Sequence, residues 1–218
     1  MSFFGTLLDL LYPPRCAFCH RLLQHDNRDV CRACLRTLPY TGDRAEREKI
    51  PQIDRCLSPL YYEKDVRASV LRYKFGHLTL YAGIYADFML QCLGKAALDF
   101  DCVCFVPVSR RRRRSRGFDQ AELLAQELAA RLNLPCVAAL RKIRHNRAQS
   151  STKSAAERRD NVKGAYRCVA DERVKGRRIL LVDDVVTTGS TLGECAAMLR
   201  AAGAASVCAV TLARARQD

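Results

Sequence analysis

The sequence predicts an α/β fold, in which a parallel sheet is flanked by helices and preceded by a small metal-binding module. Apolar runs at 102–108, 179–182 and 206–212 are typical of buried parallel strands. Segments with helical periodicity separate these runs. Two Cys-x-x-Cys pairs near the N-terminus predict the metal-binding module. With 218 residues, the chain is long enough for one core and a small appendage.

We divide the chain into three parts. Residues 1–42 are an N-terminal helix and zinc-binding module, residues 43–55 are a polar linker, and residues 56–218 form the α/β domain. The first helix covers residues 3–11, because five large apolar side chains fall on one helical stripe before a Pro-Pro pair. We expect it to pack on its own domain. Docking to a partner or to a membrane surface is the alternative.

The two Cys-x-x-Cys pairs are separated by eleven residues, a spacing typical of a zinc site. Four thiolates complete a tetrahedron with no open position, so the zinc is expected to be structural. Metal binding contributes about 10–16 kcal/mol in small zinc peptides, enough to fold a segment too small for its own core. Replacement of a cysteine by His20 or His25, and a redox disulfide pair, are the alternatives. The predicted ligands are Cys16, Cys19, Cys31 and Cys34.

A short strand and two helices are expected between the linker and the apolar run at 102–108. The strand covers residues 56–62, where apolar and aromatic side chains cluster. The first helix ends at Gly76, and a second, more apolar helix covers residues 78–93 and ends near Gly94.

The strand at 102–108 opens into Ser109 and an arginine run, Arg110 to Arg114, before a helix that begins near Asp119 and ends at Asn133. The run follows the carboxyl end of a strand, where ligands bind in open α/β sheets. We therefore expect at least one of these arginines to contact an anion. A solvated, charged face is the alternative.

The strand at 179–182 leads into the stretch that says most about function. It ends in Asp183 and Asp184, which are followed by the turn 187–191, rich in hydroxyl groups, and then by a helical pattern. A turn that feeds a helix directs backbone N–H groups and the helix dipole at one point, and Gly189 allows close approach. We expect a phosphate there. The two acids should accept hydrogen bonds from sugar hydroxyls, because carboxylates repel phosphate.

The alternative for this stretch is a strand followed by an N-capped helix, where Asp, Ser and Thr are common. Two kinds of nucleotide site are excluded. No Gly-Lys-Ser/Thr sequence follows the strand, and no G-x-G-x-x-G sequence follows any predicted strand.

The positive charge is concentrated in one segment. Of a net charge of +14, residues 110–164 carry +10, because they contain fifteen Arg and Lys but only five Asp and Glu. This favours a polyanionic ligand: pyrophosphate, nucleic acid or both. No apolar run is long enough to span a bilayer. The apolar N-terminus carries Asp9 and lacks a basic region, so we expect no secretory signal and a cytoplasmic protein.

The stretch 179–191 resembles the loop that binds phosphoribosyl pyrophosphate (PRPP) in type I phosphoribosyltransferases: an apolar strand, an acidic pair and Thr-Gly-x-Thr. The resemblance implies the type I phosphoribosyltransferase fold and PRPP bound with magnesium. It assigns PRPP binding to Asp183, Asp184, Val185, Thr187, Thr188, Gly189, Ser190 and Thr191. It assigns pyrophosphate binding to Ser109, Arg110 and Arg111.

The basic stretch 141–166 resembles the mobile flap that closes over PRPP in these enzymes. The flap residues are Arg147, Gln149, Arg158 and Asn161. A basic lid would shield a polyphosphate from water. An exposed loop and helix without such a role is the alternative.

The order of motifs along nearly the whole chain resembles the competence protein F (ComF) family. The motifs are the four-cysteine module, V-P-V before the arginines, R-G-F-D-Q-A-E-L-L-A, R-x-Q-S with E-R-x-x-N, and the acidic-pair loop. The family commonly has Asn where this chain has Asp119. The resemblance implies a cytosolic role in DNA uptake during natural transformation. Its implied partners are single-stranded DNA and a competence protein such as the uptake helicase.

Three functions fit these features. The first is a DNA-uptake factor that binds PRPP and single-stranded DNA. The second is an active phosphoribosyltransferase that moves ribose 5-phosphate from PRPP to an acceptor. The third is a non-catalytic sensor of PRPP or a nucleotide, whose zinc module docks a partner. The fold alone does not choose among them. The sequence identifies no catalytic residue, acceptor or oligomeric state.

Overall fold

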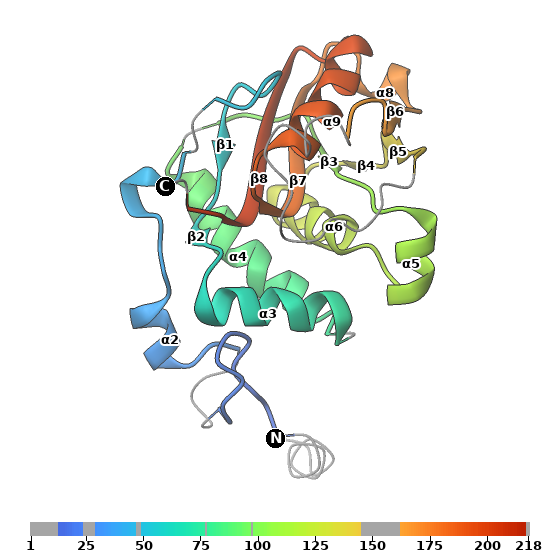
Figure 1. Ribbon diagram of the computed structural model, residues 1–218. Coiled ribbons are helices and arrows are strands. Elements are labelled where there is room, and N and C mark those ends of the chain that lie inside the picture. Colours follow the sequence, from blue (N-terminus) through green and yellow to red (C-terminus); the bar gives the residue numbers. More distant parts are fainter. Residues whose placement is uncertain are drawn as a thin grey trace.

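The computed structural model describes residues 13–23, 29–46, 49–76, 78–96, 98–144 and 162–216 (Figure 1). The helix predicted at residues 3–11 lies outside these ranges, as do His25 and the predicted flap residues Arg147, Gln149, Arg158 and Asn161. Within the described ranges, no helix is both long and apolar enough to cross a bilayer.

A six-stranded parallel sheet forms the centre of the structure, as predicted. Its order is β1-β8-β7-β3-β4, and β2 also pairs with β8. The strands are β1 (Cys56–Leu57), β2 (Leu60–Tyr61), β3 (Cys102–Phe105), β4 (Cys136–Val137), β7 (Arg178–Val186) and β8 (Ser206–Arg214). A separate antiparallel pair consists of β5 (Leu140–Lys142) and β6 (Tyr166–Cys168).

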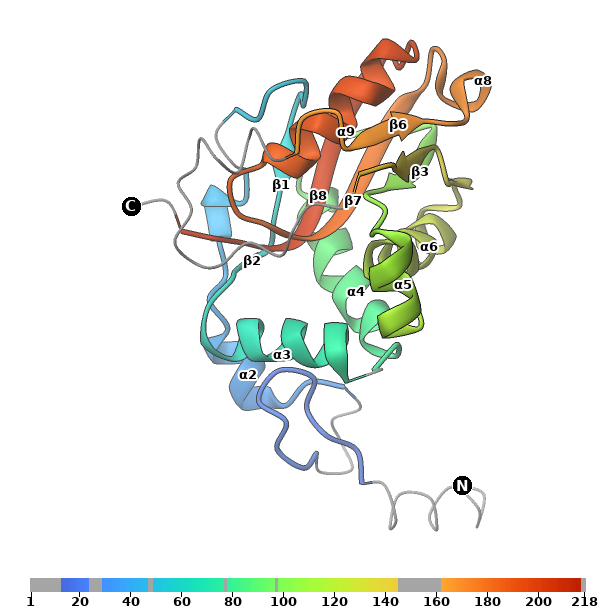
Figure 2. The same cartoon turned by 45° about the vertical axis from the view of Figure 1, so that its right-hand side comes forward.

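Helices cover both faces of the sheet (Figure 2). On one face, α4 (Tyr81–Gly94) and α6 (Gln120–Leu132) pack together and against the strands, and α9 (Ser190–Ala201) packs on the other face. Helix α3 (Lys64–Phe75) packs on α4 through Tyr73, whose ring centroid lies 5.3 Å from that of Tyr85. The short helices are α2 (Arg32–Thr37), η1 (Gly42–Arg44), α5 (Arg110–Arg116) and α8 (Asp171–Val174).

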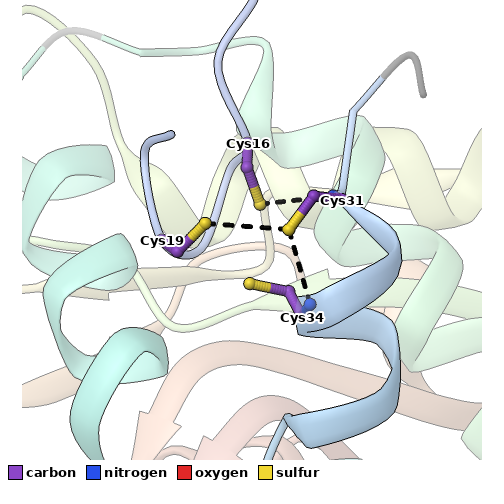
Figure 3. Close-up of side chains that lie close together, drawn as sticks. All are labelled: Cys16, Cys19, Cys31 and Cys34. Atoms are coloured by element: carbon purple, nitrogen blue, oxygen red, sulfur yellow. Dashed lines mark hydrogen bonds between the residues drawn. The ribbon is translucent and has the colours of Figure 1, made fainter. Parts of the chain in front are cut away.

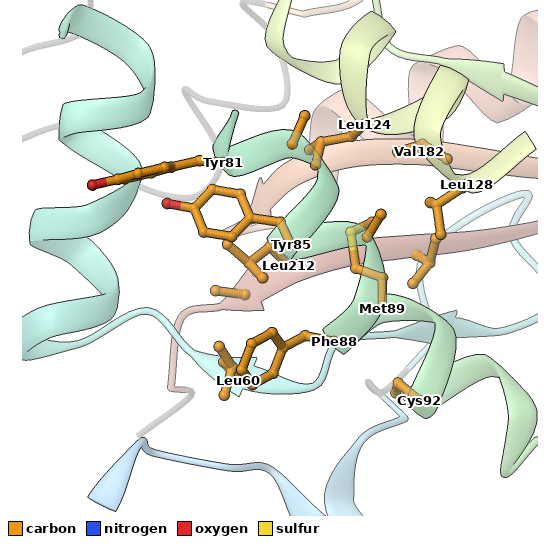
Figure 4. Packing of buried hydrophobic residues seen from close by; sticks show 14 of the residues in the cluster. Leu60, Tyr81, Tyr85, Phe88, Met89, Cys92, Leu124, Leu128, Val182 and Leu212 are labelled. Atoms are coloured by element: carbon orange, nitrogen blue, oxygen red, sulfur yellow. The ribbon is translucent and has the colours of Figure 1, made fainter. Parts of the chain in front are cut away.

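Alternating side chains of β7 divide the apolar interior into two cores. Val182 packs with α4 and α6 in one core (Figure 4), to which Leu180 also belongs. Ile179 and Leu181 point the opposite way and pack with α9 in the other. Because both faces of this strand are covered, its apolar run is continuous, which is why the sequence identified it as a parallel strand.

Two segments differ from the sequence expectation. The strand predicted at 56–62 is divided into β1 and β2, because Pro59 has no N–H to donate and the carbonyl groups before β2 accept hydrogen bonds from Thr41. The arginine run, for which no helix was predicted, forms the helix α5. Ser109 caps its start by accepting from the N–H of Arg112 at 3.4 Å, and Gly117 ends it with a φ of +78°.

Candidate functional site

The order of the strands reverses between the neighbours β3 and β7. From β3 the chain passes through α5 and α6 to β4 on one side, whereas from β7 it passes through α9 to β8 on the other side. The pairing aligns Phe105 with Val182, so both strands end at the same edge of the sheet. Ligands of open α/β sheets bind at such a reversal. The loop 183–191 and the arginine helix α5 therefore follow two adjacent strands at this edge (Figure 2).

The turn between β7 and α9 is built to approach an anion closely. Strand β7 continues through both acids to Val186, and α9 begins at Ser190. Gly189 precedes the helix with a φ of +79°, has no side chain to cap it, and is followed by a first turn without acidic residues. The Oγ1 atom of Thr188 lies 2.8 Å from the Oγ atom of Ser190. Hydroxyl groups and the positive end of the helix dipole thus meet at one place.

The two acids of the loop lie on opposite faces of β7, because successive strand residues alternate. Asp184 follows the parity of Val182 and is buried on the face of α4 and α6, where its Oδ1 atom lies 2.8 Å from Lys74 Nζ. Asp183 follows the parity of Leu181 and is only partly buried. The structure therefore brings Asp183, Thr188 and Ser190 to the same end of the strand but gives Asp184 a partner within the protein.

Lys74 was not identified from the sequence as a site residue. It lies near the end of α3, and its side chain is 20% exposed while that of Asp184 is 12% exposed. A lysine between Tyr73 and Phe75 in an amphipathic helix was the available signal, because a long cation at that position must find a carboxylate or reach water.

Burial and this ion pair set the protonation of the site. Burial, reinforced by the charge of Asp184, raises the pKa of Asp183 to about 8. Burial alone would lower the pKa of Lys74, but the interaction with the Asp184 carboxylate has a larger opposite effect, so the pKa of Lys74 is raised. Lys74 therefore stays charged, and Asp183 takes up a proton more readily than an ordinary aspartate does. A protonated Asp183 can both donate and accept hydrogen bonds, which suits the hydroxyl groups of a sugar.

Positive side chains approach the same edge from α5 and β5. Arg110 and Arg111 are exposed, and Ser109 is buried as the cap of α5. Burial, together with the charge of Arg112, lowers the pKa of Lys142, whereas the charge of Asp183 acts in the opposite direction. The Nζ atom of Lys142 also donates to the hydroxyl oxygen of Tyr166 at 3.1 Å. The sequence did not distinguish Arg112 from the other arginines of the run 110–114. Nor did it distinguish Lys142 within the basic stretch 141–166.

Asp119 ties the segment after β3 to the start of α6. Its Oδ2 atom accepts from the N–H of Val108 at 2.8 Å. Its Oδ1 atom accepts from the N–H groups of Ala121 at 3.1 Å and Glu122 at 3.4 Å. Both oxygens accept, a role for which a carboxylate is better suited than an amide. Asp119 therefore holds the approach to α5 in place and is buried away from solvent.

The four predicted zinc ligands converge (Figure 3). Their sulfur atoms all lie within 4.8 Å of one another, and the sulfurs of Cys19 and Cys31 are 3.7 Å apart. A tetrahedron with Zn–S bonds of about 2.3 Å places its sulfurs about 3.8 Å apart. Backbone N–H groups of Cys31 and Cys34 each donate to a sulfur at 3.4 Å. The cluster therefore fits a structural zinc ion, which would link the two Cys-x-x-Cys pairs.

The first cysteine pair is part of the main core. Phe18 is fully buried, and its ring centroid lies 5.4 Å from that of Phe88 on α4. Arg72 of α3 donates to the carbonyl oxygen of Ala17 at 3.1 Å and also to that of Phe18. Ser69 of α3 donates to Ala17 as well, at 2.5 Å. The zinc module is thus fixed on the same helix that supplies Lys74.

Comparison with known proteins identifies the family. Residues 119–218 match the family described as "Phosphoribosyl transferase domain", and residues 7–47 match the "Double zinc ribbon domain" family. The DNA utilization protein YhgH of Salmonella typhimurium is 32% identical over 222 residues, covering 91% of this chain and 96% of the relative. The chain belongs to the family of competence protein F and YhgH.

Other members of the competence protein F family agree with this match. Competence protein F of Haemophilus influenzae is 27% identical over 92% of this chain and 97% of the relative. Competence protein ComFC of Bacillus subtilis is 37% identical over 113 residues, which are 50% of this chain and 42% of the relative. The zinc ribbon match contains four cysteines in this chain, enough ligands for one tetrahedral site.

Two solved structures are similar to parts of this chain. Glutamine PRPP amidotransferase from B. subtilis shares 25% identity with a TM-score of 0.43, covering 62% of this chain and 26% of that chain. Adenine phosphoribosyltransferase from Thermoanaerobacter pseudethanolicus shares 18% identity with a TM-score of 0.41, covering 79% of this chain and 96% of that chain.

A cavity of about 440 Å³ lies elsewhere in this member of the family. It is lined by η1, by residues around β1 and by α4, including Glu46, Arg55 and Phe88. No residue of the loop 183–191 lines it. We therefore place the candidate ligand site at the strand ends, where the chemical groups converge, and not in this cavity.

Gly189→Ala is expected to destabilise the protein by about 1–2 kcal/mol, because alanine is strained in the left-handed backbone conformation of Gly189. A steric clash between the new Cβ atom and a neighbouring side chain should add to this loss. A Cβ atom at this position would lie 2.8 Å from both Cγ1 and Cδ1 of Ile50, a buried residue in the segment predicted as a linker. Denaturant unfolding measures the change. Gly176→Ala is the matched control, because Gly176 has a φ of +69° but nothing within 4 Å of a Cβ. Equal losses in the two variants would exclude the Ile50 contact as a cause.

Proposed function

We propose that this chain is a competence-associated protein that binds PRPP, or a related phosphorylated sugar, at the end of β7 and also binds single-stranded DNA. The observation that carries the proposal is the turn 187–191. It joins a sheet strand to the start of α9 at the strand-order reversal, with Gly189 in a left-handed conformation. The 5-phosphate would bind the backbone N–H groups and hydroxyl groups of this turn.

The ribose is proposed to bind beside Asp183. This side chain is partly exposed at the end of β7, whereas Asp184 is buried and paired with Lys74. We therefore divide the roles of the two acids. Asp183 would hydrogen-bond the 2- and 3-hydroxyl groups, and Asp184 would hold Lys74 and the end of α3 in position. The remaining predicted loop residues, Val185, Thr187 and Thr191, stay assigned to PRPP.

The pyrophosphate is proposed to lie between α5 and β5. The charge of Arg112 acts on Lys142, which carries the same charge, and an anion bound by both would be stabilised. Ser109, Arg110 and Arg111 remain candidates as predicted, and so do the flap residues outside the described ranges. Mg²⁺ usually binds one or two carboxylates, substrate phosphates and several waters. Among the described residues, the four-cysteine cluster is the one group able to hold a metal alone, so magnesium would arrive with the pyrophosphate.

Single-stranded DNA is proposed as the second ligand, because the exposed arginines of α5 form a cationic surface beside the sugar-phosphate loop. The names of the relatives, competence protein and DNA utilization protein, support a role in DNA uptake. A cytoplasmic protein that acts with an uptake helicase or another competence protein fits this role.

An active phosphoribosyltransferase is the second candidate function. The convergence of Arg112 and Lys142 favours it, because two cations at the leaving pyrophosphate would stabilise the charge that develops during transfer. Release of pyrophosphate from PRPP in the presence of a nucleobase, an amine or DNA distinguishes an enzyme from a binding protein.

Calorimetric titration with PRPP and magnesium tests the proposal. We expect the wild type to bind, and Asp183→Ala to lose about tenfold or more in affinity, because Asp183 would make hydrogen bonds to two ribose hydroxyl groups, each contributing about 0.5–1.5 kcal/mol. Saturation at 100 times Kd should also stabilise the fold by about 2.7 kcal/mol. Repeating the titration with single-stranded DNA shows whether the two ligands are coupled.

Asp171→Ala is the matched control, since Asp171 is an exposed aspartate at the start of α8, outside the loop 183–191. It should bind PRPP as the wild type does. An absence of PRPP binding by the folded wild type, or an Asp183→Ala variant with unchanged affinity, would contradict the assignment.

A further inference from the structure

A stripe of exposed apolar side chains lies at the end of α3. Leu71 and Phe75 are four residues apart on this helix and are 37% and 64% exposed, and Leu80, just before α4, is 84% exposed. Residues four apart lie on the same helical face. A single exposed leucine is ordinary in a soluble protein, but an aromatic ring flanked by leucines points to a partner.

The arginine helix α5 adjoins this stripe. The guanidinium carbon of Arg116 lies 4.8 Å from the centroid of the Phe75 ring, a cation–π contact that joins α5 to the end of α3. Arg116 is also anchored, because its NH1 atom donates to Gln120 Oε1 at 2.7 Å. One side of the ring thus has a fixed cation, while most of the Phe75 side chain stays open to solvent.

The other basic side chains of α5, the helix that contacts the ring through Arg116, are mostly exposed. Arg113 pairs with Glu122 at 3.0 Å. Arg110, Arg111 and Arg114 are exposed on the same short helix. The partner of this surface must therefore offer negative charges at close spacing together with flat apolar groups. Single-stranded nucleic acid offers both, whereas the stacked bases of a duplex are not accessible to a surface side chain.

We propose that Phe75 is a base-stacking platform for single-stranded DNA, with the arginines of α5 contacting the adjacent phosphates. This inference rests on the proposed function, which includes single-strand binding, and adds where the strand lies and how the bases are held. The strand would pass along the end of α3 and across α5. This path adjoins the sugar-phosphate site, because Lys74, which pairs with Asp184, is next to Phe75 in sequence.

Fluorescence anisotropy with labelled oligothymidylate of about 16 nucleotides tests the platform, using the full zinc-loaded chain at several salt concentrations. Phe75→Ala should weaken binding about tenfold, because stacking on one aromatic side chain has roughly that effect. The slope of log affinity against log salt should not change, because no phosphate contact is lost. Arg110→Ala and Arg111→Ala should instead each reduce the steepness of the slope by about 0.7. Phe75→Tyr should bind as the wild type does.

An abasic oligonucleotide of the same length separates stacking from charge. Phe75→Ala and the wild type should bind it equally, because it presents phosphates without bases. Equal binding of oligothymidylate by the wild type and Phe75→Ala would overturn the platform and leave single-strand binding intact. So would a Phe75→Ala defect of the same size on the abasic strand. Absence of any binding by the wild type at low salt would also refute the DNA part of the proposed function. Thermal unfolding of each variant checks that the fold is retained, and for Phe75→Ala and Phe75→Tyr an unchanged affinity for PRPP is a second check.

Discussion

Replacing Cys16 with serine is expected to remove the zinc ion and to lower the midpoint of thermal unfolding by about 10 °C. The reason is that the cysteine pair is not an isolated appendage: Phe18 and its neighbours are buried between α3 and α4. Loss of a structural metal costs several kcal/mol, and each 1 kcal/mol shifts the midpoint by about 2–4 °C in a chain of this size. Calorimetry with metal analysis measures both changes.

Cys136→Ser is the matched control for this experiment. Cys136 is exposed and lies outside the four-cysteine cluster, so its replacement should leave both the zinc content and the unfolding midpoint nearly unchanged. A strong zinc chelator should reproduce the effect of Cys16→Ser in the wild type and add little to the variant. If the metal were lost without a change in the unfolding midpoint, the module would not contribute to the stability of the main core.

Asp184→Asn is expected to reduce the free energy of unfolding by about 3 kcal/mol. The substitution leaves the ammonium group of Lys74, largely shielded from water, without its carboxylate partner. Removing one member of a buried ion pair costs more than the pair contributes as a whole, because the remaining charge is left uncompensated. Urea unfolding of the wild type and variant at neutral pH provides the measurement.

Two further variants test whether the loss of stability comes from the uncompensated charge of Lys74. Lys74→Met in the Asp184→Asn background should recover part of the lost stability, because it removes the uncompensated charge. Glu46→Gln breaks the more exposed ion pair between Glu46 and Arg55 and should cost less than about 1 kcal/mol. Equal effects of Glu46→Gln and Asp184→Asn would show that Lys74 and Asp184 are effectively solvated.

The parallel sheet and the loop 183–191 could be predicted from the sequence because both depend on local patterns. The apolar run of β7, the glycine at 189 and the following helix are contiguous in the chain, so their periodicity can be read directly. The four cysteines were recognisable for the same reason, since metal ligation requires a narrow choice of residues and spacings.

The missed features depend on contacts between distant segments. Lys74 and Asp184 are 110 residues apart in the sequence, and the tertiary packing of α3, which contacts α4 through Tyr73, brings them together. Ile50 contacts Gly189 from a segment whose polar composition predicts a linker. The opposite facing of Asp183 and Asp184 was predictable, because side chains alternate along a strand, provided that the strand is extended past the acids.

The arginine run was predicted as a single anion-binding segment, although its members differ in their surroundings. Five consecutive arginines look equivalent in a turn, but in a helix capped by Ser109 they point in different directions. The charge of Arg112 acts on Lys142, Arg113 pairs with Glu122, and Arg110 is exposed without an ion pair in the described residues. Ser109 as the N-cap and Gly117 as the C-cap would have predicted a helix, and a helix would have predicted that these arginines face different neighbours.

Helix α3 has a practical consequence for anyone who shortens this chain. Arg72 and Lys74 lie two residues apart on it, one holding the cysteine module through carbonyl oxygens and the other holding Asp184. The family matches cover residues 7–47 and 119–218, and α3 lies in neither. Expression fragments cut at those limits would lack α3, which contacts both the cysteine module and Asp184 of the loop 183–191, so their behaviour would say little about either half in the intact polypeptide.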